Sequence, residues 1–323
     1  MNNSMWLAVV FMFLMFLMFL MMNIESVVAE ELVVDPSSCS DQKFYCEIQA
    51  AIDAASDGDV VQLKDGEYEL WQQSLTIDKS ITLQGQSRNK TVLLGEGNAP
   101  SALIVVTSNA ENVVLGNLTI ANRIVGGSPT MGPGGLDHRG GDLTIDNVAF
   151  RDNRGGWGGA ARITSLFGAV HIKNSSFNNN TGFAGGGLAV YDGSALELLI
   201  ESTLFTGNNA VFSGGALLTR DVAEIKLDSV EIRNNSAGNT GGGVHTFTDT
   251  GTADLTIVAS SIVANDASKV GGISTRGADI TVTLQDSQLQ SNRSRDSLPT
   301  ADCGGVSFSL IGENDIDQLD RCQ

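Results

Sequence analysis

Residues 170–188 read VHIKNSSFNNNTGFAGGGL, and the same pattern recurs along most of the chain. Its large apolar residue, Phe177, has a counterpart every 27 to 30 residues. These anchor positions are Ile120, Phe150, Phe177, Phe205, Ile232, Ile262 and Leu289. Self-similarity at a fixed period of this size is typical of a fold built from stacked repeats.

Two apolar residues precede each anchor by seven and five positions, as Val170 and Ile172 precede Phe177. The full set is Val113/Leu115, Leu143/Ile145, Val170/Ile172, Leu198/Ile200, Ile225/Leu227, Leu255/Ile257 and Val282/Leu284. Apolar residues separated by one position have the period of a strand with one buried face. We therefore expect a short strand in each repeat, with these side chains inside.

Mostly short polar residues lie on both sides of each anchor. Three residues before it stand Asn117, Asn147, Asn174, Ser202, Ser229, Ala259 and Asp286. Such side chains bond to nearby backbone or tolerate a left-handed conformation, so we expect a turn there. Three residues after most anchors stand Asn153, Asn180, Asn208, Asn235, Asn265 and Asn292, with Asn122 one residue early in the first block. In stacked repeats this column becomes a ladder of asparagine side chains.

Glycine pairs then follow in five blocks: Gly158-Gly159, Gly186-Gly187, Gly214-Gly215, Gly242-Gly243 and Gly271-Gly272. A second short strand is expected after each pair, beginning at Ala160, Leu188, Ala216, Val244 or Ile273. Strands this short cannot bury a face alone, so the blocks must stack at the strand spacing of about 4.8 Å. A propeller blade needs about 40 residues or more, and the L-x-x-L-x-L pattern of leucine-rich repeats is absent. The sequence predicts an all-β, single-stranded right-handed parallel β-helix.

Both ends of the mature chain differ from the repeat. Residues 47–56 (EIQAAIDAAS) place Ile48, Ala51 and Ile52 on one helical face. We expect a short helix there, which covers the open end of the stack and protects an aggregation-prone edge. Residues 302–323 are expected to form the closing coil at the other end.

The stretches 46–52 and 57–68 resemble the opening of secreted right-handed parallel β-helix proteins of the pectin-lyase-like and polymorphic-outer-membrane-protein-like group. The repeats resemble that group's F-x-x-N and G-G pattern, and residues 302–312 resemble its closing coil. One departure is Gln49, because the group carries Arg in the opening helix. The resemblance implies a β-helix over about residues 39–322. It does not choose an activity, because the group includes polysaccharide lyases, hydrolases, epimerases and adhesins.

An uncharged apolar run, Met5 to Met22, precedes the repeats. The small residues before Glu30 favour a cleaved secretory signal over residues 1–29, with one β-helix domain over residues 30–323. The predicted location is therefore secreted, extracellular or at the cell surface. Membrane attachment is expected only if the segment stays uncleaved. The formal net charge of −18 argues against nucleic acid as a partner.

Four cysteines lie near the ends of the mature chain: Cys39, Cys46, Cys303 and Cys322. In an exported protein an even count suggests disulfides, and two local pairs are the simplest of the three possible connectivities. Their spacing does not match a metal site, so we expect no bound metal. The Asn-x-Ser/Thr sequence makes glycosylation candidates of Asn89, Asn117, Asn174, Asn179, Asn234 and Asn292.

The densest cluster of candidate catalytic residues is Asp137, His138, Arg139 and Asp142, within a glycine-rich stretch that we expect to be an irregular insertion. Loops on rigid scaffolds often carry active sites. A polysaccharide lyase needs a base beside carboxylates that bind Ca²⁺, so Ca²⁺ is a possible cofactor only for that activity. Otherwise no cofactor is expected. His171 and His245 neighbour inward residues and are expected to point outward.

Aromatic residues near the glycine pairs have two interpretations: ordinary turn packing, which is favoured, and a binding face for a polysaccharide or cell-surface glycan. Four residues after the glycine pairs come Ile163, Tyr191, Thr219, Phe247 and Arg276, which we expect to form one exposed stripe. Trp157, Phe183 and Phe212 lie just before the glycines. Trp157, Tyr191 and Phe247 are the candidate contacts. The favoured hypothesis is a non-enzymatic surface, matrix or glycan-binding protein; the alternatives are a pectin-lyase-like carbohydrate-active enzyme and a purely structural secreted protein.

Overall fold

The computed structural model describes residues 12, 29–37, 47–95, 99–125, 132–165, 167–249, 251–277, 279–296, 302–305 and 308–316. Contacts between residues divide the chain into two units, Met1–Glu30 and Glu31–Gln323. Of the expected signal segment only Met12 and Ala29 are described, so cleavage stays a prediction. No helix in the described ranges is long and apolar enough to span a membrane.

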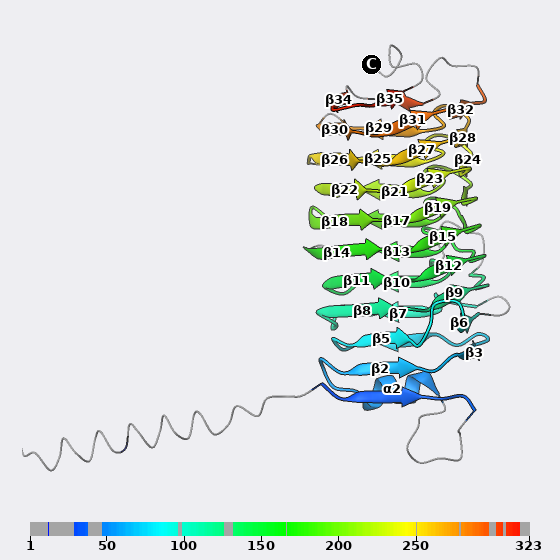
Figure 1. Cartoon of the computed structure of the whole chain (residues 1–323), viewed down its shortest axis with the longest axis vertical. Coiled ribbons are helices and arrows are strands. Elements are labelled where there is room, and N and C mark those ends of the chain that lie inside the picture. The colour runs from blue at the N-terminus through cyan, green and yellow to red at the C-terminus, as the bar shows by residue number, and fades with distance from the viewer. Residues whose placement is uncertain are drawn as a thin grey trace, which may run out of the picture. The chain divides into compact units, whose positions relative to one another are not determined.

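The second unit winds in successive rungs, whose corresponding strands pair in parallel to form four sheets, A to D (Figure 1). Within the described ranges, sheet A has the eleven strands β1 (Glu31–Val34), β2 (Val60–Leu63), β5 (Thr82–Gly85), β8 (Asn112–Gly116), β11 (Asp142–Asp146), β14 (Phe167–Lys173), β18 (Ala195–Glu201), β22 (Glu224–Asp228), β26 (Ala253–Val258), β30 (Ile280–Gln285) and β34 (Phe308–Ile311). Sheet B, which carries the anchors, has ten in the same ranges: β3 (Gly66–Glu69), β6 (Thr91–Leu94), β9 (Thr119–Ala121), β12 (Ala149–Arg151), β15 (Ser176–Asn178), β19 (Leu204–Thr206), β23 (Glu231–Arg233), β27 (Ser261–Val263), β31 (Gln288–Gln290) and β35 (Asp315–Ile316).

The other two sheets follow the glycine-rich half of each rung. For the part of the chain that is described, sheet C has nine strands: β4 (Leu75–Ile77), β7 (Ile104–Val106), β10 (Leu136–His138), β13 (Ala161–Ile163), β17 (Leu188–Tyr191), β21 (Leu217–Arg220), β25 (Val244–Phe247), β29 (Ile273–Arg276) and β33 (Cys303–Gly304). Sheet D has five described strands of two residues each: β16 (Thr181–Gly182), β20 (Asn209–Ala210), β24 (Ser236–Ala237), β28 (Asp266–Ala267) and β32 (Arg293–Ser294). The predicted right-handed parallel β-helix is confirmed.

Apolar side chains of successive rungs lie one above the next in the interior. In sheet A the paired, fully buried column includes Ile145, Ile172, Ile200 and Leu227. In sheet B the rings of Phe150, Phe177 and Phe205 stack with centroids 4.8 and 4.6 Å apart. Burying side chains of this size is worth about 1.5–3 kcal/mol each, so these columns supply the main stabilising term. The predicted core ladders are therefore confirmed.

Left-handed residues turn the chain at two corners of each rung. The expected corner before the anchors has φ between 45° and 56° at Asn117, Asn147, Asn174, Ser202, Ser229, Ala259 and Asp286. A second corner, which the sequence did not reveal to us, has φ between 54° and 66° at Asn122, Asp152, Asn179, Gly207, Asn234, Ala264 and Ser291. Asn, Asp and Gly adopt this conformation at least cost, which explains why they dominate both columns.

The predicted asparagine ladder is fully formed inside the corner between sheets B and D. Asn180 Nδ2 donates to Asn208 Oδ1 at 3.0 Å and to the Phe150 carbonyl at 3.1 Å. Asn208 Oδ1 also accepts from the Asn180 backbone N–H at 3.0 Å, and Asn208 repeats the pattern toward Asn235. Each of these amides is buried, and hydrogen bonding satisfies groups that would otherwise be costly to remove from water.

Charged residues occupy both ends of this ladder. Asn292 Nδ2 donates to Asp302 Oδ1 at 2.9 Å, and at the other end the Arg123 N–H donates to Asn153 Oδ1 at 3.1 Å. Ile120 pairs with the anchor Phe150, so the ladder position three residues after it is Arg123 and not an asparagine. Asn122 lies one residue earlier and forms the second corner. The aligned amides point Oδ1 toward Arg123 and N–H toward Asp302. The terminal charges therefore have the signs that stabilise such an array of dipoles.

The predicted capping helix is present, and the part of the predicted closing coil that is described continues the stack. Helix α2 (Ile48–Ala54) buries Ile48, Ala51 and Ile52 and packs against strands β1, β2 and β4. The last strands, β33 to β35, extend sheets C, A and B through Ile316. The rest of the expected closing coil, residues 317–323, lies outside the described residues.

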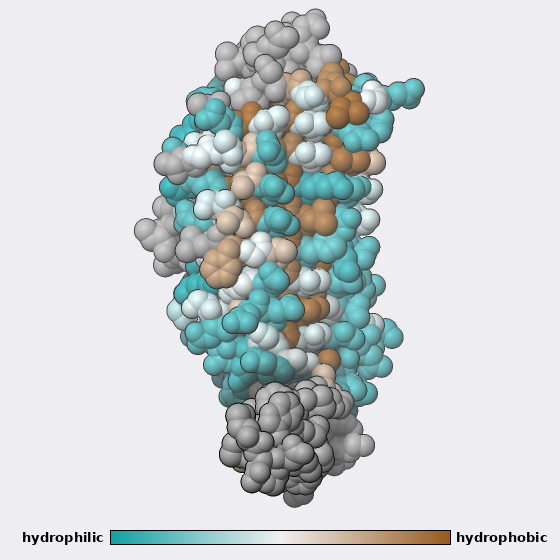
Figure 2. All heavy atoms as spheres, turned by 90° about the vertical axis from the view of Figure 1, so that its left-hand side faces the viewer, coloured by the Kyte–Doolittle hydropathy of each residue, from teal (hydrophilic) through white to brown (hydrophobic). Residues whose placement is uncertain are grey.

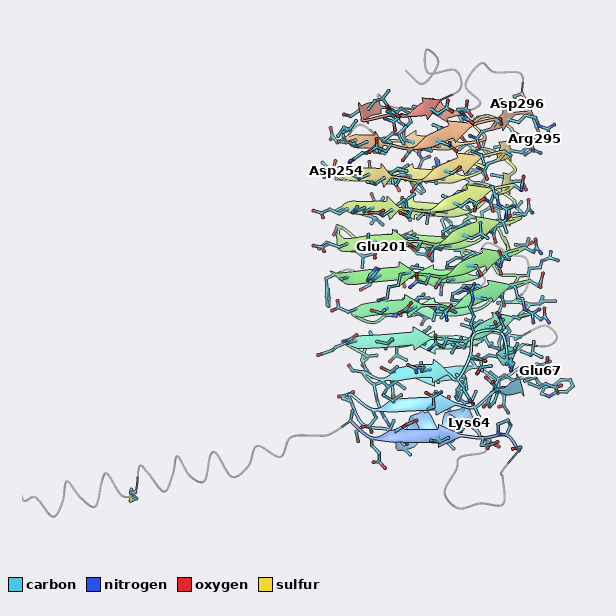
Figure 3. The ribbon with its side chains drawn as sticks, in the orientation of Figure 1. Lys64, Glu67, Glu201, Asp254, Arg295 and Asp296 are labelled. Carbon is cyan, nitrogen blue, oxygen red and sulfur yellow. The ribbon has the colours of Figure 1, made fainter. Side chains whose placement is uncertain are left out.

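Stacking also orders the outer surface. On the face shown in Figure 2, side chains of similar hydropathy lie above one another in vertical rows. Charged residues such as Glu201 and Asp254 project outward from sheet A (Figure 3). A groove or stripe on this protein is therefore assembled from equivalent positions of several rungs.

We predict that Asn208→Ala lowers the free energy of unfolding by about 2–3 kcal/mol, because it leaves buried donors and acceptors of Asn180 and Asn235 unpaired. Urea unfolding followed by circular dichroism measures the change. The matched control is Asn209→Ala, since Asn209 is exposed and, among the described residues, its side chain accepts a single surface hydrogen bond, from Ser236. Equal stabilities for the two variants would contradict the structural role of the ladder.

Candidate functional site

The stretch that we expected to be an irregular insertion contains a regular strand. β10 pairs with β7 and β13, so Leu136 aligns with Ile104 and Ala161. The expectation of a loop was wrong because glycines on both sides of the strand hid its two-residue alternation. Within β10, Asp137 faces outward and His138 faces the interior.

Asp137 is held by two arginines on the outer face of sheet C. Its carboxylate accepts hydrogen bonds from Arg139 Nε at 3.1 Å and from Arg162 Nε and Nη2, both at 2.7 Å. Only 4% of the Asp137 side chain is exposed. Burial lowers the pKa of Arg162, but its hydrogen bond to Asp137 and that residue's charge outweigh burial and raise it. Charge-assisted hydrogen bonds from both arginines hold this carboxylate in place and occupy its oxygen atoms.

The other two candidates lie elsewhere. His138 is fully buried, and its Nε2 lies 2.9 Å from the Gly141 carbonyl. Asp142 is exposed, and its Oδ1 accepts from the Ala169 N–H at 2.8 Å. Arg139 and Asp142 both line a hollow of about 540 Å³ with Phe167, while Asp137 lies outside its lining. The four predicted residues therefore do not converge in one groove.

The predicted aromatic stripe also needs correction. Tyr191, Arg220, Phe247 and Arg276 occupy one column of sheet C. Ile163 and Thr219 instead belong to the adjacent buried column with Val190. The sequence prediction counted four residues from each glycine pair. Strands β13 and β21 begin one residue later than this count assumes, because Ala160 and Ala216 lie between the glycines and the strand, so Ile163 and Thr219 were assigned to the wrong face. Slipping by one residue exchanges the inner and outer faces of a strand.

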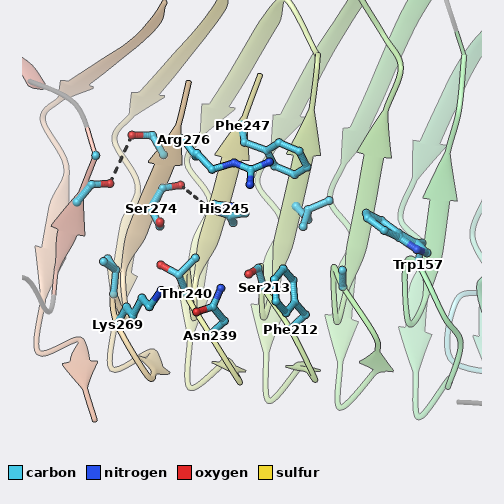
Figure 4. Close-up of a pocket in the computed structure, with 16 residues that line it drawn as sticks. Trp157, Phe212, Ser213, Asn239, Thr240, His245, Phe247, Lys269, Ser274 and Arg276 are labelled. Carbon is cyan, nitrogen blue, oxygen red and sulfur yellow. Dashed lines mark hydrogen bonds between the residues drawn. The ribbon is translucent and has the colours of Figure 1, made fainter. Parts of the chain in front are cut away.

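A groove with a volume of about 520 Å³ runs across several rungs on this corrected outer face (Figure 4). Ala184, Leu218, His245 and Ser274 are among the residues along its length. Phe212, Asn239 and Lys269 line it from the turns that precede the strands, and Phe247 and Arg276 line it from the strands themselves. Its lining also includes Trp157 on an earlier rung and Gly304–Gly305 on a later one.

Aromatic side chains form a cluster over this face, outside the main core. Trp157, Phe183 and Tyr191 pack against buried residues that include Leu218 and Phe247. Trp157 meets Tyr191 edge-on at 5.4 Å between centroids. The stacked rings of Phe183 and Phe212 are 6.0 Å apart, and half of Phe212 is exposed. The structure thus brings the three aromatic candidates Trp157, Tyr191 and Phe247 together on one face.

The groove carries positive charge on a strongly acidic protein. Lys269 and Arg276 line it, whereas none of the described lining residues is acidic. Arg276 lies over the Phe247 ring at 4.7 Å and pairs with Asp249 at 3.3 Å. This cation–π contact fixes the guanidinium beside the groove, where it can donate to oxygen atoms of a ligand. Sequence reasoning missed Lys269 and His245 because neither belongs to the patterns that define the repeat.

Both histidines expected outside face away from the core, but only His171 is surface-exposed. His171 hydrogen bonds Glu201, with 32% of its side chain exposed. His245 is only 6% exposed, because it lies within the groove beside Phe247. Burial, together with the charge of Arg276, lowers the pKa of His245 to about 4, and the hydrogen bond to Ser274 opposes this only in part. Burial also lowers the pKa of His138.

The glycosylation candidates differ in accessibility. Asn89, Asn174, Asn179 and Asn234 are exposed, and Asn117 is half-buried. Asn292 is buried in the ladder, so the folded protein does not expose this glycosylation candidate. Cys303 is buried in β33, while Cys39, Cys46 and Cys322 lie outside the described residues, so the pairing of the cysteines stays a prediction.

No protein-family model matches the chain, and comparison with curated proteins finds no match. Among solved structures, the chain is similar to a pectin methylesterase variant in complex with a hexasaccharide, with 14% identity, a TM-score of 0.41 and coverage of 81% of this chain and 90% of the other. It is also similar to the A-module of an Azotobacter vinelandii mannuronan C-5 epimerase, with 15% identity, a TM-score of 0.41 and coverage of 90% and 96%. A Geobacillus virus E2 protein gives 14% identity and a TM-score of 0.44, covering 83% of this chain and 56% of its own. Likeness at these levels concerns the backbone fold alone.

We predict that acidification weakens the fold between about pH 6.5 and pH 4. In this window the unfolded chain protonates His245 while the folded chain keeps it neutral. The stabilisation is complete above pH 6.5 and is lost as the pH falls toward 4, on the order of 3 kcal/mol for His245. Urea titrations across this range measure the slope of stability with pH.

The variant His245→Phe should reduce this slope, because the ring is kept and the titrating nitrogen is removed. His171→Phe is the matched control, since His171 is partly exposed. The same slope in wild type and His245→Phe would show that His245 does not cause the pH dependence.

Proposed function

We propose that this protein binds a glycan chain along the groove of sheet C without cleaving it. One observation carries the proposal: several rungs combine aromatic rings, a largely apolar floor and two cationic side chains in a single open groove. Ligand sites typically combine apolar and aromatic walls with a few polar groups that fix orientation.

The chemistry of the lining suits a sugar. Phe212 offers a half-exposed ring, and Trp157, which packs edge-on against Tyr191, adds aromatic surface on an earlier rung. The apolar faces of sugar rings can pack on such aromatic side chains, which combine large apolar area with defined geometry. Lys269 and Arg276 supply donors for hydroxyl, ring or carboxylate oxygens. Because the groove runs from rung to rung, an extended polymer fits it better than a compact molecule.

The alternative activity, a polysaccharide lyase with Ca²⁺, depends on four residues that do not all line one groove. Asp137 is engaged by Arg139 and Arg162, and His138 is buried in the interior. Asp142 lies in a separate hollow. Ca²⁺ requires several free oxygen ligands around one point. Binding is therefore the proposal that uses the site as it is built.

We also propose that the protein acts outside the cell. The apolar N-terminal run, the four cysteines and the exposed Asn-x-Ser/Thr sequences support export. An extracellular location would give the groove access to matrix or cell-surface polysaccharide.

We predict that Phe212→Ala weakens glycan binding about tenfold or more, equivalent to about 1.4 kcal/mol. The ring is half exposed, so its removal should leave the core intact. Binding is measured by calorimetry against neutral hexasaccharides of glucose, xylose, galactose and mannose, and against uronate hexasaccharides. Phe167→Ala is the control, because that exposed ring lies in the lining of a different hollow.

The same uronate samples, with and without Ca²⁺, are monitored in the ultraviolet for unsaturated product. Product formation would favour the lyase alternative over binding alone. Failure of the wild-type protein to bind every member of the panel would overturn the proposal. Equal affinities for Phe212→Ala and wild type would move the binding site away from this groove.

A further inference from the structure

Two polar side chains in the groove have hydrogen-bonding capacity that the described residues do not use. Ser213 is fully buried, and its hydroxyl has no hydrogen-bond partner within the described part of the chain. It nevertheless lines the groove, next to Phe212. An unpaired buried hydroxyl costs about 1–3 kcal/mol. Rotation of the Ser213 side chain toward the groove would let a ligand pair with this hydroxyl and recover that free energy on binding.

His245 provides the second group, with a defined polarity. Its Nδ1 lies 3.1 Å from the Ser274 carbonyl, which can only accept, so Nδ1 carries the proton (Figure 4). The neutral ring then has a lone pair on Nε2. No described residue hydrogen bonds this nitrogen. It is also not completely buried, unlike the unpaired hydroxyl of Ser213. Nε2 is therefore an acceptor open to the groove.

The fold places these two groups on neighbouring rungs. The backbone of Ser213 pairs with that of Thr240 on the next rung. His245 lies on the same rung as Thr240 and pairs with Leu218 of β21, which is on the rung of Ser213. Adjacent rungs are about 4.8 Å apart, and both Ser213 and His245 line the same groove. The rings of Phe212 and Phe247 line the same groove, and His245 stacks on Phe247 at 5.3 Å.

We propose that Ser213 and His245 form a subsite that recognises the hydroxyl groups of a neutral sugar residue. This inference rests on the proposed glycan-binding function and deepens it. His245 Nε2 accepts a hydrogen bond from one sugar hydroxyl, and Ser213 Oγ pairs with a second. A carboxylate at this position could not donate a hydrogen bond, and its lone pairs would repel the lone pair of Nε2. The subsite therefore selects a hydroxyl donor over an ionised acid.

The charged groups near His245 keep this acceptor available at neutral pH. Arg276 on β29 and Lys269 of the preceding turn line the groove, and Arg220 lies on the neighbouring strand β21. Asp249 is paired with both arginines. Arg276 opposes protonation of the ring, as burial does, so the neutral form persists well below pH 7.

The test uses the tightest-binding neutral hexasaccharide of the panel, with Ser213→Ala and His245→Phe. Each variant should bind about three- to tenfold more weakly, the effect of losing one hydrogen bond. Ser213→Ala should unfold at the same urea concentration as wild type or a higher one, because it removes an unpaired hydroxyl. Weaker binding without lost stability separates recognition from a structural role.

Nitrogen-15 NMR of the free wild-type protein supplies an independent readout. His245 should show a protonated Nδ1 and an unprotonated Nε2, and bound hexasaccharide should shift the Nε2 resonance. His171→Phe is the matched control and should bind as wild type does.

The opposite tautomer, or unchanged affinity in both variants while wild type binds, would overturn the subsite and leave the proposed function standing. Binding of uronate hexasaccharides alone, unaffected by either substitution, would also overturn it. If wild type binds no member of the panel, the proposed function and the subsite fail together.

Discussion

Parallel pairing between successive rungs is the constraint on which the rest of this structure depends. Each rung bonds to the rungs on both sides through its backbone, so a residue has the same position in every rung as its counterparts above and below. A buried side chain must therefore pack or bond with the residues at its own position in the rungs above and below. Phenylalanine meets this condition by stacking and asparagine by passing a hydrogen bond along the column. Columns of identical residues follow from this geometry, and so does the repeat in the sequence.

The asparagine ladder links packing to polarity. A corner that turns away from a sheet leaves backbone groups without strand partners, and the amide side chains supply donors and acceptors there. Their alignment gives the column a direction, and its ends carry residues of fitting charge, Arg123 and Asp302. Arg123 extends this role, since its buried guanidinium also donates to the carbonyls of Gln73 and Ser101, while burial lowers its pKa to about 10. The end of the ladder is thereby tied to loops of earlier rungs.

The same stacking builds the groove. Because outward positions repeat at the rung spacing, a few exposed aromatic and cationic residues become a continuous surface, although each is far from the next in sequence. Acidic residues outnumber basic ones by 37 to 19 in the chain, and the described lining of the groove contains no acidic residue. Ser213 and His245 are polar groups in this groove, and their unused hydrogen-bonding capacity is the feature that most directly implies a ligand.

Sequence alone determined the architecture, the sheet A register, the left-handed corner at positions such as Asn174, the asparagine ladder and the capping helix. Each of these rests on a column in which every rung repeats the same chemical requirement, so the pattern is visible in one dimension. Only the tertiary structure decided the face of each sheet C residue. Glycine-rich segments carry no apolar alternation, and a slip of one residue exchanged inside and outside for Ile163 and Thr219. The inward turn of His138 and the grouping of Ser213, His245 and Lys269 likewise depend on contacts between rungs, which no single repeat contains.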